Sequence, residues 1–236
     1  MDAVTEKFSV FDFFNLVIAG MVFWMLLGIC HYSQLQILIK KFSLFISGSS
    51  LLLFATVVTF MGDAFIVGAA FQVISIWLFK KKIHWEKDIM QKCLTKDVLF
   101  DNEIRLNALR KRANDYLERP EGSAHFTPDK CEAFYAHCVY YLHVKELDKK
   151  TEKLRETQGL SKLLSCMFFT IPIISISIYV FQLLILRMVN LNLLAVIITY
   201  LVCFAFGYIF YCRYNITCKN RMRLVLSIYD ANCQLK

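Results

Sequence analysis

Residues 163–212 read LLSCMFFTIPIISISIYVFQLLILRMVNLNLLAVIITYLVCFAFGYIFYC and carry a single charged side chain, that of Arg187. The runs 163–186 and 190–212 are each long enough to cross a hydrocarbon core about 30 Å thick as a helix. Only Arg187-Met188-Val189 separates them. The stretch therefore predicts two membrane spans that form a tight antiparallel hairpin.

Two further apolar runs precede this hairpin, at residues 10–30 and 43–79. The first has the length of one span, and it lacks the basic start and the small-residue cleavage site of a signal peptide, so we expect a retained helix. The second is interrupted only by Gly62-Asp63. As one helix it would be about 55 Å long, longer than a membrane is thick. Two spans would need an unusually tight turn. We expect one long helix and four spans, with five as the alternative.

The composition agrees with a membrane protein. The chain has 236 residues, of which 57% are hydrophobic and 19% charged, with a mean hydropathy of +0.48. Soluble domains are usually less apolar and more charged, so an ordinary soluble enzyme, a disordered chain and a disulfide-rich secreted module are excluded. With only 3 Pro and 8 Gly, a loop-rich β fold is also disfavoured. The predicted fold class is an all-α, polytopic transmembrane protein.

The positive charges predict the orientation. Of the 27 Lys and Arg residues, 18 lie in residues 80–162 and 5 in residues 213–236. Basic residues near span ends stay on the cytoplasmic side, so both segments are expected inside an inner (cytoplasmic) membrane, as is the C-terminus. Lys40 and Lys41 would then face outward, which is the best argument for five spans.

Four regions are predicted from these patterns: the N-terminal membrane helices (1–79), a cytoplasmic helical insert (80–162), the C-terminal transmembrane hairpin (163–212) and a basic cytoplasmic tail helix (213–236). In the insert, Leu106, Leu109, Ala113 and Tyr116/Leu117 recur at helical spacing, which predicts a helix with one buried stripe that ends near Arg119. Thr127-Pro128 predicts the start of a second helix. We expect this helix to run through Leu154 and on into the third span, so that the insert is a helical hairpin.

A row of arginines marks the first of these two helices. Arg105, Arg112 and Arg119 are seven residues apart and lie nearly on one line. Guanidinium groups bind phosphate oxygens in pairs, so a nucleotide, an oligonucleotide or anionic lipid headgroups are candidate ligands. The full candidate site is Arg105, Arg110, Lys111, Arg112, Arg119 and His125. The alternative is a solvated face, because acidic residues lie four positions before Arg105 and Arg119.

Catalytic and metal-binding patterns are missing from the sequence. Cys131, His137, Cys138 and His143 have neither C-x-x-C nor H-E-x-x-H spacing, and a packed helical core explains them better. No nucleophile elbow, P-loop or dinucleotide fingerprint occurs, and the acidic residues of the insert form no carboxylate pair. We expect no enzyme activity, no metal and no cofactor.

Polar residues within the spans are candidates to line a pore or a subunit interface, because a charge in hydrocarbon is costly. They are Asp12, Asn15, Asp63, Thr170, Ser177 and Gln182, although Asp12 could instead lie in the headgroup layer. In the fourth span, small residues recur every four positions and would let helices approach closely. This ridge comprises Ala195, Thr199, Cys203 and Gly207; it could pack within the chain or between subunits.

The chain resembles a family on three stretches: FDFFNLVIAG at 11–20, GAAFQVISIWLF at 68–79 and RYNITCKNRMRLVLSIYDA at 213–231. Together with the insert and the hairpin, these are similar to the small four-span membrane effectors of bacterial anti-phage systems, such as the Hailong membrane effector or the Kiwa membrane subunit. The resemblance implies an oligomeric channel that depolarises the cell when a signal binds inside. It also implies a cytosolic operon partner, such as a nucleotidyltransferase, that supplies the signal.

The predicted function is therefore a ligand-gated, pore-forming effector. We expect a homo-oligomer in the lipid bilayer, taken to be a tetramer, that responds to a nucleotide or oligonucleotide signal. The alternative is a membrane-anchored adaptor or sensor that recruits a cytosolic partner and forms no pore.

Overall fold

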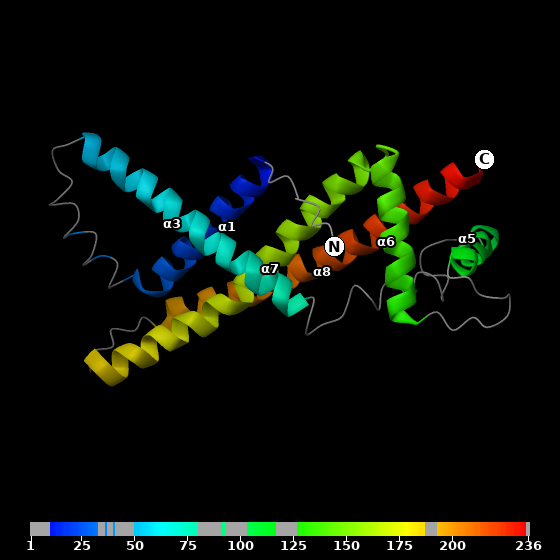
Figure 1. Cartoon of the computed structure of the whole chain (residues 1–236). Coiled ribbons are helices and arrows are strands. Elements are labelled where there is room, and N and C mark those ends of the chain that lie inside the picture. Colours follow the sequence, from blue (N-terminus) through cyan, green and yellow to red (C-terminus); the bar gives the residue numbers. More distant parts are fainter. Residues whose placement is uncertain are drawn as a thin grey trace. The chain divides into compact units, whose positions relative to one another are not determined.

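The computed structural model describes residues 10–32, 36, 40, 50–79, 91–92, 103–116, 127–186 and 193–234. Its longer helices are α1 (Val10–Cys30), α3 (Ser50–Trp77), α5 (Glu103–Tyr116), α6 (Pro128–Val144), α7 (Lys149–Phe181) and α8 (Leu193–Gln234), with a π-helical turn at Gln182–Leu186 (Figure 1). These ranges contain no strand. The predicted all-α class is confirmed.

Four helices, α1, α3, α7 and α8, are long and apolar enough to cross a membrane. The ambiguous second run is a single helix from Ser50, since α3 passes through Gly62 and Asp63 without a break. In the part of the chain that the structure describes, four candidate spans are therefore found, and the polytopic membrane fold is confirmed. Residues 43–49 lie outside the described part.

Two compact units divide the chain. The membrane unit comprises Met1–Ser75 and Leu160–Tyr211, and the insert unit comprises Ile76–Gly159 and Cys212–Lys236. These boundaries fall within four residues of those predicted from composition. The tail, expected as a region of its own, belongs to the same unit as the insert.

In the membrane unit, α1 and α3 touch backbone to backbone. A Cβ atom at Gly20 would lie 1.8 Å from the carbonyl oxygen of Ala64, and one at Gly68 would lie 2.1 Å from that of Leu16. The partner numbers fall on one helix as they rise on the other, so the two helices are antiparallel. Only residues without a side chain permit this approach.

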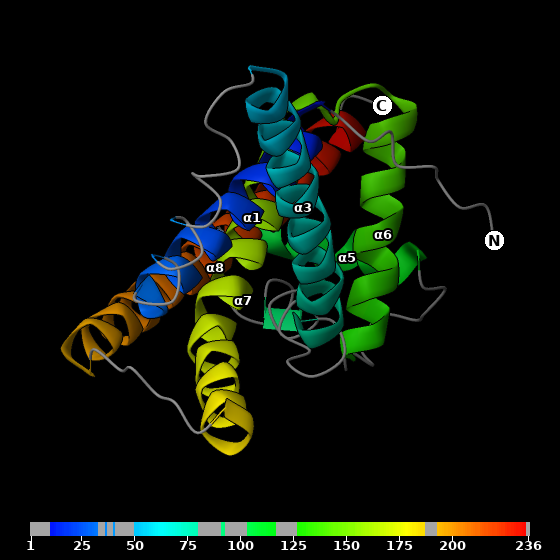
Figure 2. The same ribbon diagram turned by 90° about the vertical axis from the view of Figure 1, so that its left-hand side faces the viewer.

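The two later spans, α7 and α8, pack through aromatic rings. Phe168 stacks on Phe206 and Phe210, with ring centroids 5.6 and 5.7 Å away, and Phe169 lies over Gly207. Phe169 also approaches Phe204, so the pair is antiparallel, as the sequence predicted. Figure 2 shows that the two helices diverge toward the ends nearest residues 187–192, which lie outside the described part.

The insert unit has a core of three helices. Leu106, Leu109 and Ala113 of the predicted stripe in α5 are buried, as are four residues of α6, and both sets pack against the tail end of α8. Tyr116, expected in the same stripe, is 45% exposed, and Leu117 lies outside the described residues. This core includes Phe134 and Leu142 of α6 and Met222 and Tyr229 of α8. The expected two-helix hairpin is therefore completed by a third helix that is distant in sequence.

Two helix boundaries differ from the prediction. α6 begins at Pro128 as expected, with Thr127 at the N-cap position although its hydroxyl makes no capping hydrogen bond, but it ends at Val144 instead of running through Leu154. Glu146 has a φ of 55°, and the N–H of Leu147 donates to the carbonyl of Leu142 at 2.9 Å while that of Glu146 donates to His143. This is the Schellman arrangement that closes a helix. It usually has glycine where this chain has glutamate.

The tail is not a separate helix. α8 runs unbroken from Leu193 to Gln234, through the position at which a new helix was expected. Tyr214, near that position, is fully buried in the insert unit, and its ring lies 4.9 Å from that of Phe79. No glycine or proline occurs between Tyr208 and Gln234, so the sequence offers the helix no reason to stop.

The contact between α1 and α3 can be tested with alanine. Gly20→Ala or Gly68→Ala should each lower the free energy of unfolding by about 3 kcal/mol, because the added methyl group forces the two backbones apart. The measurement is thermal unfolding in detergent, followed by circular dichroism. Gly62→Ala is the control: it lies in α3 with nothing within 4 Å of the new methyl group, and should leave stability unchanged or raise it. Equal melting temperatures for all three variants would contradict the contact.

The left-handed residue between α6 and α7 gives a second test. Glu146→Gly should raise the unfolding free energy by about 1 kcal/mol, because glycine adopts a positive φ without strain. Glu152→Gly, at an exposed position inside α7, should instead lower it by a similar amount. If both glycine variants destabilise the protein equally in the same melting assay, the turn is not as described.

Candidate functional site

The predicted phosphate-binding row is only partly within the described structure. Arg105 lies in α5 without a described side chain, and Arg119 and His125 fall outside the described residues. Arg110 is half-buried and donates to the Asn107 side chain at 3.3 Å, while Lys111 is exposed. Arg112, also half-buried, is the third member of the row whose side chain is described.

Arg112 has a structural partner instead. Its Nη1 lies 2.6 Å from a carboxylate oxygen of Asp230 and 3.0 Å from the backbone oxygen of the same residue. Asp230 is 1% exposed, whereas Arg112 retains 24%. The guanidinium thus compensates a buried charge and ties α5 to α8 within the insert unit. Asp230 is 118 positions further along the chain, so the spacing of the arginines gave no sign of it.

The cysteines of α6 lie in the core, but the histidines do not. His137 is half-buried and stacks on Tyr116, and His143, expected in the core, is exposed with its Nδ1 2.7 Å from a carboxylate oxygen of Asp148. Cys131 and Cys138 are fully buried. Burial raises the pKa of the Cys131 thiol to about 11, and burial, with a smaller contribution from Cys233, raises the pKa of Cys138 to about 12. Both thiols therefore stay protonated at neutral pH and are poor ligands and nucleophiles. Within the described ranges, no group of three or more His, Cys, Asp or Glu residues could hold a metal.

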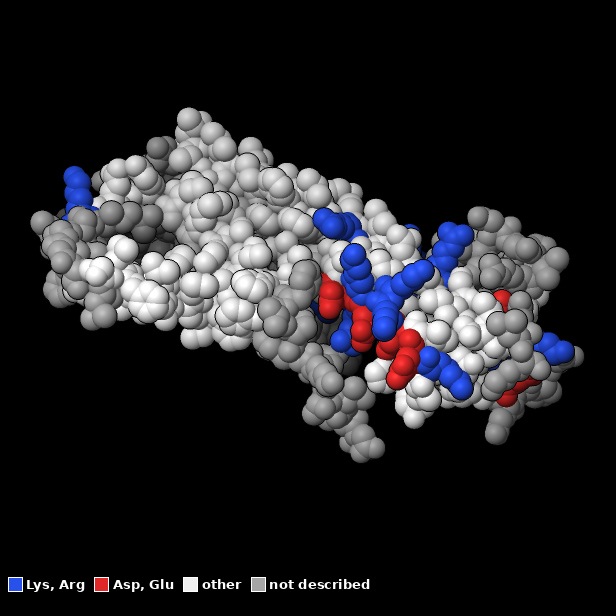
Figure 3. Space-filling model, turned by 90° about the horizontal axis from the view of Figure 1, so that it is seen from above, with Lys and Arg blue, Asp and Glu red and all other residues white. Residues whose placement is uncertain are grey.

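The first turns of α7 carry a mixed charged surface. Figure 3 shows Lys and Arg side chains interleaved with Asp and Glu over part of one face of the molecule. In α7, exposed basic residues alternate with an acidic one: Lys149, Lys150, Glu152, Lys153 and Arg155. Such alternation is typical of a solvated helix face.

In the membrane unit, several pore candidates are satisfied by their own helix. The Thr170 hydroxyl donates to the carbonyls of Cys166 and Met167, and the Ser177 hydroxyl donates to that of Ile173. Asn15 is half-buried in α1, and the side chain of Asp12 is not described. None of these contacts joins the candidates to one another.

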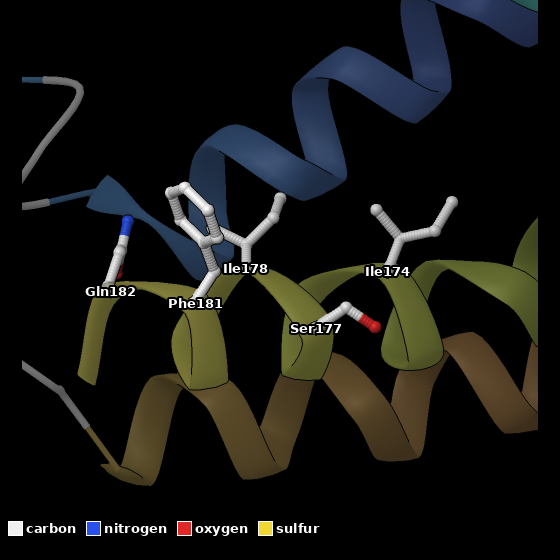
Figure 4. Close-up of a pocket in the computed structure, with 5 residues that line it drawn as sticks. All are labelled: Ile174, Ser177, Ile178, Phe181 and Gln182. Carbon is white, nitrogen blue, oxygen red and sulfur yellow. The ribbon is translucent and has the colours of Figure 1, made fainter. Parts of the chain in front are cut away.

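Ser177 and Gln182 do share a shallow pocket of about 470 Å³ on α7. Its other lining residues are Ile174, Ile178 and Phe181. Figure 4 shows these three apolar side chains rising on one side of the helix, with Ser177 projecting to the side. A largely apolar, open hollow of this kind fits an acyl chain better than an ion.

Asp63 differs from the other candidates because it is both charged and exposed. It lies 11 residues from one end of the candidate span Leu52–Trp77 and 14 from the other. Thr56 and Thr59, also exposed, share its face of α3 at helical spacing. The sequence interpretation included Asp63 but missed the two threonines, although Thr59 and Asp63 follow Thr56 by 3 and 7 residues, which is helical spacing.

The small-residue ridge of α8 packs inside the chain. Cys203 is fully buried, Thr199 is 5% exposed, and Gly207 accepts a hydrogen bond from Ser165 at 3.0 Å through its carbonyl oxygen. A Cβ atom at Gly207 would lie 3.1 Å from the ring of Phe169. Thr199, Cys203 and Gly207 are therefore buried within the membrane unit, with Gly207 against α7. Ala195 is half-buried at the start of the ridge.

One polar cluster was not anticipated. His31, 9% exposed, lies with Nε2 3.3 Å from the hydroxyl of Ser175, and its ring centroid is 4.4 Å from that of Tyr179. The Tyr179 hydroxyl donates to the carbonyl of Cys30. These contacts fasten the end of α1 to α7. The only sequence signal was a histidine directly after an apolar run.

The fold and these contacts define a multi-pass, all-α membrane protein. Comparison with protein-family models, with curated proteins and with solved structures gives no match. The functional argument therefore depends on the residues of this chain.

Mutation of the Arg112–Asp230 ion pair tests whether Arg112 has a structural or a ligand-binding role. Arg112→Gln and Asp230→Asn should each lower the unfolding free energy by about 3 kcal/mol, because each leaves a partly or fully buried charge unpaired. The double variant should lose less than the sum of the two. Lys111→Gln, on the same helix but exposed, should change stability by no more than about 0.5 kcal/mol. Equal melting temperatures for Arg112→Gln and Lys111→Gln would show that the pair contributes nothing to stability.

Proposed function

We propose that this chain is the subunit of a homo-oligomeric pore in the membrane, with α3 at the contact between subunits and along the pore. One observation carries the proposal: Asp63 is exposed near the middle of a candidate span. At 1.5 Å per residue, it lies about 16 Å from one end of the span and about 21 Å from the other. That is close to the centre of the hydrocarbon core.

A carboxylate at that depth facing lipid is unfavourable. An acidic side chain at the centre of a membrane helix costs about 3 kcal/mol on insertion scales, and such residues normally face protein or water. None of the residues that the structure describes covers Asp63. A second copy of α3 and a water-filled path would both satisfy it.

The burial of the four spans supports the same face. In an apolar 18-residue window of each helix, 11% of the residues are buried in α3, against 44% in α1, 50% in α7 and 22% in α8. Three exposed polar residues, Thr56, Thr59 and Asp63, lie on one face of α3, and Gln72 lies on the opposite face. Polar side chains are unfavourable on a helix that faces only lipid.

Gating is proposed to start in the insert unit. α7 and α8 each contribute residues to both units, so a change in the insert unit can be passed along continuous helices. An anionic signal at the basic residues around Lys111 would have to bind the open state more tightly than the closed one. A role in anti-phage defence, by depolarising the cell, is the biological setting that we propose for such a channel.

The first experiment measures ion flux. Liposomes that contain the purified protein and a trapped ion that quenches a fluorescent dye should release this ion, either without ligand or after addition of ATP or short oligonucleotides. The purified protein should also be an oligomer by native mass spectrometry. Liposomes that stay tight under every condition, with a monomer in detergent, would contradict the pore. A monomer that co-purifies with a soluble protein would favour the adaptor.

The second experiment locates the subunit contact. In a chain whose native cysteines are replaced, Ile66→Cys, which is 65% exposed on α3, should form intermolecular disulfides in membranes under mild oxidation. Phe71→Cys is the matched control on the same helix, because Phe71 is 5% exposed and packs inside the chain. Cross-linking through Phe71→Cys alone would place the contact elsewhere.

A further inference from the structure

We infer that the pore conducts cations in preference to anions and that Thr56, Thr59 and Asp63 form its selectivity stripe. The inference rests on the proposed function, because it assigns a substrate class to the same face of α3. The evidence that it adds is the kind of hydrogen-bonding group that this face offers.

The three residues lie along one line of α3. Thr56 and Asp63 are seven residues apart, which leaves them about 20° apart around the helix, and Thr59 lies about 40° to the other side of Asp63. The stripe extends about 10 Å along the axis. All three side chains are exposed.

The stripe presents oxygen acceptors and no donors. Thr56 donates its hydroxyl proton to the carbonyl of Leu52 at 2.8 Å, and Thr59 donates to that of Ala55 at 2.8 Å. A hydroxyl has one proton and two lone pairs, so the lone pairs remain for a partner outside the helix. An ionised carboxylate only accepts. Oxygen acceptors replace the hydration shell of a cation, whereas an anion needs donors.

Charge along the spans points the same way. In the described apolar parts of α1, α3, α7 and α8, at 10–30, 50–77, 163–181 and 193–212, no lysine or arginine occurs. The charged residues there are Asp12 and Asp63, both acidic. A pore along these helices offers a negative field and no positive charge that would attract an anion.

The test is a reversal potential. Channels in a planar bilayer between unequal KCl concentrations should reverse close to the Nernst potential of K⁺. Asp63→Asn should lower the permeability ratio of K⁺ to Cl⁻ by about tenfold, and Asp63→Lys should favour Cl⁻. Asp63→Glu, which keeps the charge, should retain the preference. Gln72→Leu is the control, because Gln72 is exposed on α3 but lies about 180° around the helix from Asp63.

The outcomes separate the two proposals. A conducting wild-type channel that prefers anions, or one whose permeability ratio is the same in Asp63→Asn and Gln72→Leu, overturns the cation stripe and leaves the pore intact. An absence of current in every variant, with tight liposomes, overturns the pore itself. A wild-type preference for K⁺ that Thr59→Val weakens would support the stripe even if Asp63→Asn failed to fold.

Discussion

The close approach of α1 and α3 at Gly20 and Gly68 determines which side chains of α3 face α1 and which point outward. Because the carbonyl of Ala64 lies where a side chain of Gly20 would be, α3 can turn only one narrow face toward its neighbour. Ala64, Gly68, Phe71 and Ser75 follow that face and are buried. Asp63 precedes Ala64 by one residue and therefore points about 100° away, out of the helix pair. The exposed carboxylate is thus a consequence of the glycine contact.

The insert unit is held by a different kind of contact. Its apolar core brings three helices together without fixing their register, since hydrophobic burial has no direction. The Arg112–Asp230 pair fixes the register of α5 against α8, because the hydrogen bonds from a guanidinium to a buried carboxylate depend on their geometry. An arginine that is needed to hold α5 against α8 is a poor choice for a ligand. This leaves Arg110 and Lys111 as the described basic residues of α5 with which an anionic signal could interact.

What the sequence predicted well was local and periodic. The four long apolar helices, the start of α6 at Pro128 and the buried positions Leu106, Leu109 and Ala113 follow from the local sequence, so no partner needed to be known. The failures were of two kinds. Glu146 has the left-handed conformation that glycine usually adopts at a helix end, so no glycine in the sequence indicated where α6 ends. The partners of Arg112 and His31 lie 118 and 144 residues away, and spacing within one helix cannot reveal them.

Asp63 limits which functions fit this chain. An adaptor needs only an anchor, and a plain apolar helix would anchor it at a lower insertion cost than one with a carboxylate at its centre. Asp63 has no structural duty comparable to that of Asp230, because no ion pair to it occurs in the described residues and its side chain is exposed. A charge that is unfavourable in lipid, and that the fold itself turns outward through the glycine contact, implies water or another subunit on that side. The proposed pore would satisfy both conditions, and the threonine hydroxyls beside Asp63, whose protons are donated within α3, are the reason that we infer a preference for cations.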